Sequence, residues 1–163
     1  FVDTPEVESI GWDANDHRLC HWGKFRDKAS GREFFYFNSH LFWRLEVARS
    51  MSGGVLVSQV QKIAGDSPAI AVGDYNSREE SKQVQDILAL LNDAYRVSET
   101  APAGPVETDL GGGNFLGPAK ARIDFIFTSK DIRVKDYAVI DDKRDNGHYP
   151  SDHLPIVCTL EIE

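Results

Sequence analysis

Hydrophobic and polar positions alternate in two segments near the start of the chain, and this alternation predicts a β-hairpin. The first segment runs from Arg18 to Phe25, the second from Glu33 to Leu41, and turn-forming residues 27–31 separate them. The second segment contains four consecutive aromatic residues, at positions 34–37. A continuous apolar run of this kind is typical of a strand that is buried on both faces.

A longer pattern follows and predicts a helix over residues 46–64. Gly53 and Gly54 lie inside it and are expected to weaken the helix by roughly 1 kcal/mol each relative to alanine. Gly65 is expected to end it. The side chains predicted to face inward recur at spacings of one, three and four; they are Val47, Met51, Val55, Leu56, Val60 and Ile63.

The rest of the chain alternates between strand and helix patterns, which predicts an α/β fold. Ser77 is the predicted N-cap of a second helix, with Glu80 completing a capping box. Residues 98–120 are rich in glycine and proline and long for a passive connection, so we expect them to flank a functional site. The remaining predicted strands are 69–72, 122–128, 132–140 and 156–162.

Length and charge narrow the function classes. The chain has 163 residues, which predicts one domain over 1–163. A net charge of −8 disfavours a long nucleic acid as the substrate, because proteins that hold polyanions usually carry a basic stripe. The sequence has neither an apolar run of the roughly 18 residues that a membrane span needs nor a signal-peptide pattern.

The start of the chain is unusual. The first residue is Phe1 and the only methionine is Met51, so we expect a processed product or a fragment. Cys20 and Cys158 are too few to indicate a disulfide framework. We expect a soluble protein, and the sequence leaves the compartment open between cytoplasmic and secreted.

Candidate chemistry lies where apolar strands meet short polar groups. Asp74 and Asn76 follow one strand, Asp124 lies inside another, and Asp152 and His153 precede the last strand. A buried carboxylate is costly unless it is paired, hydrogen-bonded or bound to metal, so these groups together indicate one polar site. The simpler interpretations are a turn at residues 73–76, an ion pair with an arginine such as Arg122 for Asp124, and a turn or helix cap at residues 151–153.

Four short motifs resemble the endonuclease/exonuclease/phosphatase superfamily of metal-dependent phosphoesterases, and they occur in that family's order. They are Phe-Asn-Ser-His at 37–40, Gly-Asp-Tyr-Asn at 73–76, Arg-Ile-Asp-Phe-Ile-Phe at 122–127 and Ser-Asp-His-Leu-Pro at 151–155. Residues 3–7 together with residues 11–14 are similar to an uncharacterised bacterial hydrolase branch of that superfamily. The resemblance implies a four-layer α/β sandwich, in which helices flank two mixed β-sheets, and a Mg²⁺ or Mn²⁺ cofactor.

The resemblance also implies roles for individual residues. Asp152 and Asp74 are the expected metal ligands. Asn38, Asn76 and His40 are expected to bind the substrate. The expected catalytic set is His40, Asp74, Asn76, Asp124 and His153, with Asp124 holding the imidazole and His153 acting as base or as a stabilising imidazolium.

Two departures from the family pattern bear on function. Leu41, Phe42 and Trp43 follow His40 where family members usually carry a polar residue, often aspartate. The chain also resembles only the later part of the family domain, so the strand-end asparagine and the glutamate that usually binds the metal are expected to be missing. Glu6 and Glu8 lack the apolar strand that the family glutamate follows. An incomplete sheet would favour oligomer formation.

Three functional hypotheses follow. The first is metal-dependent hydrolysis of a small or lipid-like phosphate ester, by a phosphodiesterase or phosphatase mechanism in which water attacks phosphorus. The second is a non-catalytic remnant that binds a phosphorylated ligand or a partner protein. The third is a nuclease of the same superfamily.

Overall fold

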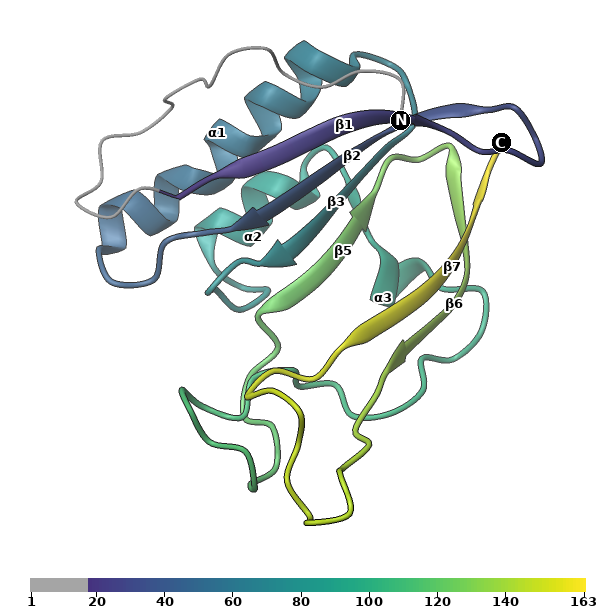
Figure 1. The fold of residues 1–163 in the computed structure, drawn as a ribbon. Helices are drawn as coiled ribbons and strands as arrows, with labels where there is room; N and C mark the ends of the chain where they lie inside the picture. The colour runs from purple at the N-terminus through teal and green to yellow at the C-terminus, as the bar shows by residue number, and fades with distance from the viewer. Residues whose placement is uncertain (1–17) are drawn as a thin grey trace.

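The computed structural model describes residues 18–163, which form a mixed five-stranded sheet, a separate two-stranded hairpin and three helices (Figure 1). The similarity motif at the very start of the chain lies outside these residues. The strands are β1 Cys20–Arg26, β2 Glu33–His40, β3 Ala69–Asp74, β4 Asn92–Asp93, β5 Asp124–Thr128, β6 Ile132–Val139 and β7 Ile156–Ile162. The helices are α1 Glu46–Ala64, α2 Lys82–Leu88 and α3 Ala94–Val97.

The order of the strands determines where the polar groups meet. The large sheet runs β1-β2-β3-β5-β4, and the β2–β3 pair is parallel while β3 and β5 are antiparallel. The ends of β2 and β3 therefore lie at the same edge as the beginning of β5. The register places His40 opposite Asp74, and Asp74 opposite Asp124.

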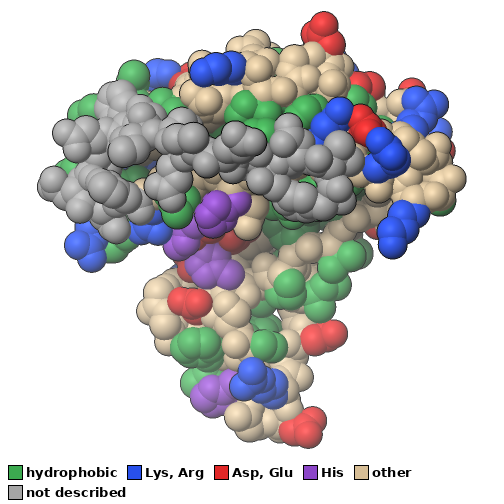
Figure 2. Space-filling view, turned by 45° about the horizontal axis from the view of Figure 1, so that its top comes forward, with side chains coloured by type: hydrophobic (Ala, Val, Ile, Leu, Met, Phe, Trp, Pro, Cys, Tyr) green, Lys and Arg blue, Asp and Glu red, His purple; other side chains and the backbone are tan. Residues whose placement is uncertain are grey.

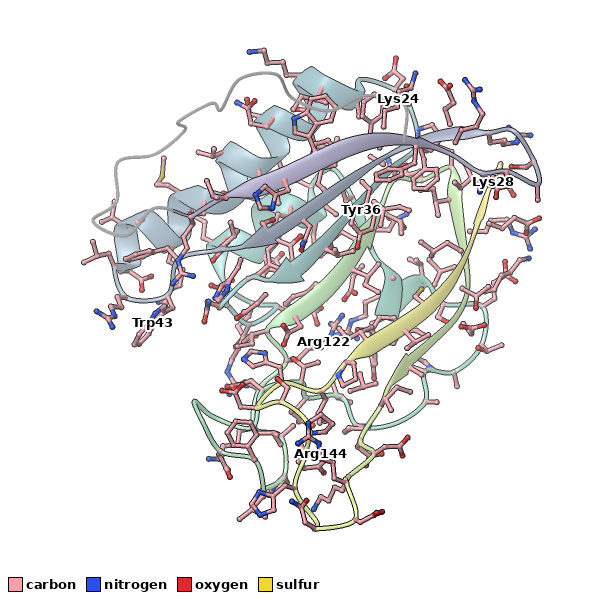
Figure 3. All side chains as sticks on the ribbon, viewed as in Figure 1. Lys24, Lys28, Tyr36, Trp43, Arg122 and Arg144 are labelled. Carbon is pink, nitrogen blue, oxygen red and sulfur yellow. The ribbon has the colours of Figure 1, made fainter. Side chains whose placement is uncertain are left out.

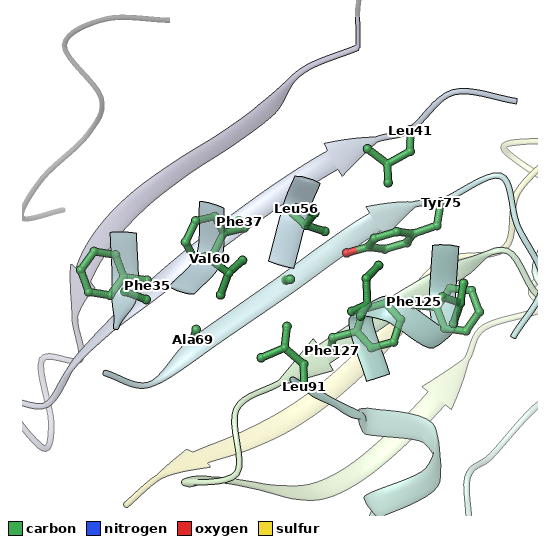
Figure 4. Close-up of a cluster of buried hydrophobic side chains, with 14 residues drawn as sticks. Phe35, Phe37, Leu41, Leu56, Val60, Ala69, Tyr75, Leu91, Phe125 and Phe127 are labelled. Carbon is green, nitrogen blue, oxygen red and sulfur yellow. The ribbon is translucent and has the colours of Figure 1, made fainter. Parts of the chain in front are cut away.

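The main hydrophobic core lies between the sheet and the helices α1 and α2 (Figure 4). Phe35 and Phe37 are 8% and 1% exposed, whereas Tyr36 between them is 36% exposed. The prediction that the aromatic strand is buried on both faces is therefore wrong. Successive strand residues point to opposite faces, and among the described residues the helices cover only one of these faces at β2.

Helix α1 spans the predicted residues and Gly65 caps its end, and of the side chains predicted to face inward Leu56 and Val60 are buried, whereas two at the start of the helix are not. Val47 and Met51 are 67% and 42% exposed. Besides Leu56 and Val60, the buried side includes Ala48, Gly53 and Ala64, which were not predicted to face inward. Gly53 lets α1 approach α2 closely, because a Cβ atom at this position would lie only 2.1 Å from the backbone oxygen of Gln83.

The start of α2 also differs from the prediction. Ser81, and not Ser77, is the N-cap, and its hydroxyl accepts a hydrogen bond from the Val84 amide. The Ser77 hydroxyl is buried and donates to the Gln83 side-chain oxygen at 2.5 Å. The capping prediction is wrong because both serines precede the apolar pattern, and the Ser77–Gln83 contact depends on tertiary structure.

The hairpin β6–β7 packs against the other face of the large sheet through a second core that includes Tyr137, Leu154 and Ile126. Phe125 and Phe127 point to the helices, while Ile126 points to the hairpin. The mixed α/β layers agree with the expected sandwich. No helix in the described part of the chain is long and apolar enough to span a bilayer.

Candidate active site

Three segments that are distant in sequence bring the candidate residues together. Asp74 ends β3, Asp124 begins β5, and His153 lies just before β7. One ligand atom from each of these three residues lies within 4.8 Å of the other two. Figure 2 shows histidine and acidic side chains gathered at one place on this face of the molecule.

Asp74 is half-buried and its carboxylate has two different neighbours. One oxygen accepts the Asn76 amide at 2.8 Å, and the other lies 3.3 Å from Nε2 of His40. Burial raises the pKa of Asp74, and the nearby carboxylate of Asp124 raises it further. A positive charge beside this pair of acids would relieve their repulsion.

Asp124 and His153 form a hydrogen-bonded dyad. Nδ1 of His153 lies 2.8 Å from Oδ2 of Asp124, and the ring N–H donates because a carboxylate can only accept. This contact raises the pKa of His153 to about 9. The imidazole is therefore positively charged at neutral pH. The alternative ion pair between Asp124 and Arg122 is not formed, because the Arg122 guanidinium donates to both oxygens of Asp93 at 2.8 and 2.5 Å.

Two residues of the site were not found from the sequence. Thr108 is fully buried; its hydroxyl donates to Oδ2 of Asp124 at 2.6 Å and accepts from the amides of Ile123 and Asp124. Asp109 places an oxygen 3.7 Å from Nε2 of His153. Both belong to the loop 98–120 that was expected to flank a site. The loop length was the only signal in the sequence that pointed to them.

We expect Asp124→Asn to lower the pKa of His153 from about 9 towards its ordinary value of 6.5, because the largest cause of the shift is the hydrogen bond to Asp124. An NMR pH titration of the imidazole resonances measures this directly. The raised pKa also predicts that the dyad stabilises the wild-type fold fully below about pH 6.5, and that this stabilisation is lost as pH rises through about 9. If the pKa of His153 is unchanged in the variant, a group other than Asp124 is responsible for raising it.

The other predicted substrate contacts lie around this cluster. Asn76 has a positive φ of 49°, and its side-chain amide donates to the backbone oxygen of Leu41 at 3.0 Å. His40 is 59% exposed at the end of β2. Asn38 is exposed on the same strand, two residues earlier, and is not part of the three-residue cluster. Their roles in binding stay predictions.

Asp152 has a different environment from that of the other acids. Its Oδ2 accepts the Gly113 amide at 2.7 Å, and this bond holds the pKa of the carboxyl below its usual range. It does not belong to the cluster of candidate ligand atoms, in which the acids are Asp74 and Asp124. Its assignment as a metal ligand stays a prediction.

The donor set fits a hard divalent cation. Mg²⁺ and Mn²⁺ prefer oxygen ligands, and two half-buried carboxylates face each other across the β3–β5 pair. Burial is the largest cause of the raised pKa of Asp74 and the Asp124 carboxylate adds to it, so a bound cation would favour the ionised form of both acids. Asp74 and Asp124 are therefore the described carboxylates best placed to hold a cation.

A hollow of about 660 Å³ opens beside the cluster. Asp74, Asp124 and His153 line one part of it. Its apolar wall comes from both sheets and includes Tyr36, Val72, Ile126, Ile140, Leu154 and Ile156. Figure 3 shows Tyr36 over the sheet face that the hairpin β6–β7 leaves open.

Comparison with known proteins gives a consistent result. A family model described as the endonuclease/exonuclease/phosphatase family matches residues 4–153. Nocturnin of Drosophila melanogaster is 24% identical over 186 residues, covering 93% of this chain and 29% of that protein.

Solved structures from two Bacteroides species are also similar. One is an endonuclease/exonuclease/phosphatase from Bacteroides vulgatus, with 31% identity and a TM-score of 0.82 over 97% of this chain and 60% of that one. The other is a mannosyl-6-phosphatase from Bacteroides thetaiotaomicron, with 30% identity and a TM-score of 0.81 over 99% of this chain and 63% of that one. The chain thus spans about three fifths of these relatives.

Proposed function

Because the chain belongs to the endonuclease/exonuclease/phosphatase family, we propose that it carries part of the catalytic centre of a divalent-metal-dependent phosphoesterase. Members of this family hydrolyse phosphate esters. The observation that carries the proposal is the convergence of Asp74, Asp124 and His153, whose ligand atoms lie within 4.8 Å of one another. Two acids and an imidazole held this close together are suited to promote attack by water on phosphorus.

The geometry divides the work between the residues. Asp124 engages Nδ1 of His153, so Nε2, which lies 3.7 Å from an Asp109 oxygen, is the nitrogen that would face a phosphoryl oxygen. As an imidazolium, His153 would stabilise the charge that develops there, rather than act as the base. Asp74 would orient the attacking water and accept its proton. His40 and Asn76 would contact the non-bridging oxygens, with Asn38 supporting them.

The cation would be Mg²⁺ or Mn²⁺, held by Asp74 with Asp124 or Asp152. When bound it would neutralise the phosphoryl oxygens and assist the leaving group. The Thr108 hydroxyl, by donating to Asp124, would fix the carboxylate that holds His153. Most of the rate increase would then come from positioning and electrostatics.

The substrate in this proposal is small or lipid-like. The apolar wall of the hollow, with Tyr36, Val72 and Ile156, would favour an ester with an apolar part. A net charge of −8 disfavours a long nucleic acid, so the nuclease alternative is the weaker one.

We expect hydrolysis of 4-nitrophenyl phosphate or bis(4-nitrophenyl) phosphate that needs Mg²⁺ or Mn²⁺, because the two facing carboxylates need a neutralising ion. Release of 4-nitrophenol, followed by absorbance, measures this. Activity should be lost with EDTA and regained with excess Mg²⁺. Turnover that is unchanged in EDTA would reject the metal-dependent mechanism, and turnover of neither ester would favour the non-catalytic alternative.

Association through the sheet face opposite the helices, which residues 18–163 leave partly uncovered at Tyr36, is a second element of the proposal. The exposed side chain of Tyr36 and the apolar residues beside it lie on the face opposite the helices. A large exposed apolar surface favours association. Sedimentation of the wild-type chain and of Tyr36→Lys tests this, and a monomer at all concentrations would contradict it.

A further inference from the structure

A second, smaller recess of about 360 Å³ lies next to the proposed active site. Asn76 and Asp109 line it, and both also touch the site: Asn76 through the Asp74 carboxylate, and Asp109 through His153. The remaining wall carries two guanidinium groups, from Arg49 and Arg78. This recess carries two positive charges, whereas the wall of the 660 Å³ hollow is mainly apolar. The two cavities therefore suit different parts of a substrate.

Arg78 is the positively charged group in this recess without a matching acid. Its guanidinium donates one hydrogen bond, to the backbone oxygen of Lys120 at 3.1 Å. Arg78 is exposed, and this contact leaves the other N–H donors of its guanidinium available. Among residues 18–163, no carboxylate lies within ion-pair distance of Arg78, whereas Arg96 and Arg122 each contact an acid.

Arg49, Trp43 and Asp109 also line the recess. Arg49 contacts Glu46 and donates to the backbone oxygen of Trp43 at 3.5 Å, so it is held at the start of α1. Trp43 is 50% exposed, and Figure 3 shows it projecting from the loop between β2 and α1. Trp43 is the last of the three apolar residues that follow His40 where a polar residue was expected. Asp109, the acid in the recess, faces the His153 imidazolium.

We propose that this recess binds a second phosphate group of the substrate through Arg78, with Trp43 beside it as an aromatic surface. Guanidinium groups bind phosphate through paired, charge-assisted hydrogen bonds, and Arg78 has such donors available. The substrate class is then a small bisphosphorylated ester, one phosphate lying at Asp74 and His153 and the other at Arg78. This inference rests on the proposed function, since it names the substrate of the same site.

The test compares binding of adenosine 3′,5′-bisphosphate with that of adenosine 3′-monophosphate and adenosine 5′-monophosphate, by calorimetry in Mg²⁺. Loss of a charged hydrogen-bonded contact typically changes affinity by about tenfold or more, so the bisphosphate should bind at least about tenfold more tightly than either monophosphate. Arg78→Gln should reduce that ratio to about threefold or less. Arg32→Gln, an exposed arginine in the β1–β2 turn, should preserve the ratio and serves as the matched control.

Equal affinity for the three nucleotides in the wild type, no measurable binding of the bisphosphate, or an unchanged ratio in Arg78→Gln would each overturn the inference. Phosphate release measured in the same samples separates it from the proposed function. A preference for the bisphosphate without turnover would leave the subsite standing and contradict hydrolysis. Turnover without a preference for the bisphosphate would support hydrolysis and contradict the second phosphate site.

Discussion

Asp74→Asn is expected to lower kcat/KM for phosphate-ester hydrolysis by about a thousandfold or more, because it removes both a candidate base and a metal-binding charge. The same substitution should leave the free energy of unfolding unchanged or increase it. Burial raises the pKa of Asp74, so the ionised carboxylate is less favourable in the folded protein than in the unfolded one. The variant should therefore be at least as stable as the wild type at pH 7, as measured by urea denaturation.

Asp66→Asn is the matched control for this prediction. Asp66 is an exposed acid between α1 and β3, and its replacement changes the net charge by the same amount. Activity in this control should remain at the wild-type level. If Asp74→Asn retains more than about a tenth of the wild-type kcat/KM, Asp74 neither binds the metal nor takes the proton, and the proposed division of roles fails.

The second large effect is expected at the contact between α1 and α2. Gly53→Ala should destabilise the protein by about 3 kcal/mol, because the new methyl group would lie 2.1 Å from the Gln83 backbone oxygen and force the helices apart. Gly54→Ala, at the next position, places its methyl group 3.6 Å from the nearest atom outside the helix backbone, an oxygen of Asp86. It should be neutral or more stable by up to about 1 kcal/mol, since alanine favours a helix.

Thermal and urea unfolding of the two variants measure the difference. The pair is informative because both substitutions have the same intrinsic effect on helix propensity, so only the tertiary contact separates them. Equal stabilities for Gly53→Ala and Gly54→Ala would contradict the prediction. They would mean that the space between α1 and α2 at Gly53 is wide enough for a methyl group, against the 2.1 Å distance to the Gln83 backbone oxygen.

The sequence predicted elements better than it predicted which side of an element is buried. The bounds of α1 follow from a run of helix-compatible residues and a terminal glycine, which are local properties. Its rotation was wrong at Val47 and Met51, because the closest packing partner, α2, requires the small Gly53 on the inner face. A hydrophobicity pattern gives glycine no weight, so it placed Leu56 and Val60 on the buried face but could not place Gly53 there.

The same limit applies to the site. Strand ends place Asp74 and Asp124 at one edge, and the sequence pattern was sufficient to indicate this. The Thr108 hydroxyl could not be found, because its bond to Asp124 joins a loop residue to a strand sixteen positions away. The hydrogen bond between Asp152 and Gly113 was hidden for the same reason, since it joins positions 39 residues apart.

The contact between His153 and Asp124 joins the segment before β7 to the large sheet. An opening motion that swings the hairpin away from the sheet would therefore disassemble the dyad before any strand unfolds. The turnover rate would then depend on the equilibrium between the open and closed arrangements of the hairpin and the large sheet. A ligand that binds both sheets and favours the closed arrangement would act as an activator without contacting the phosphate group.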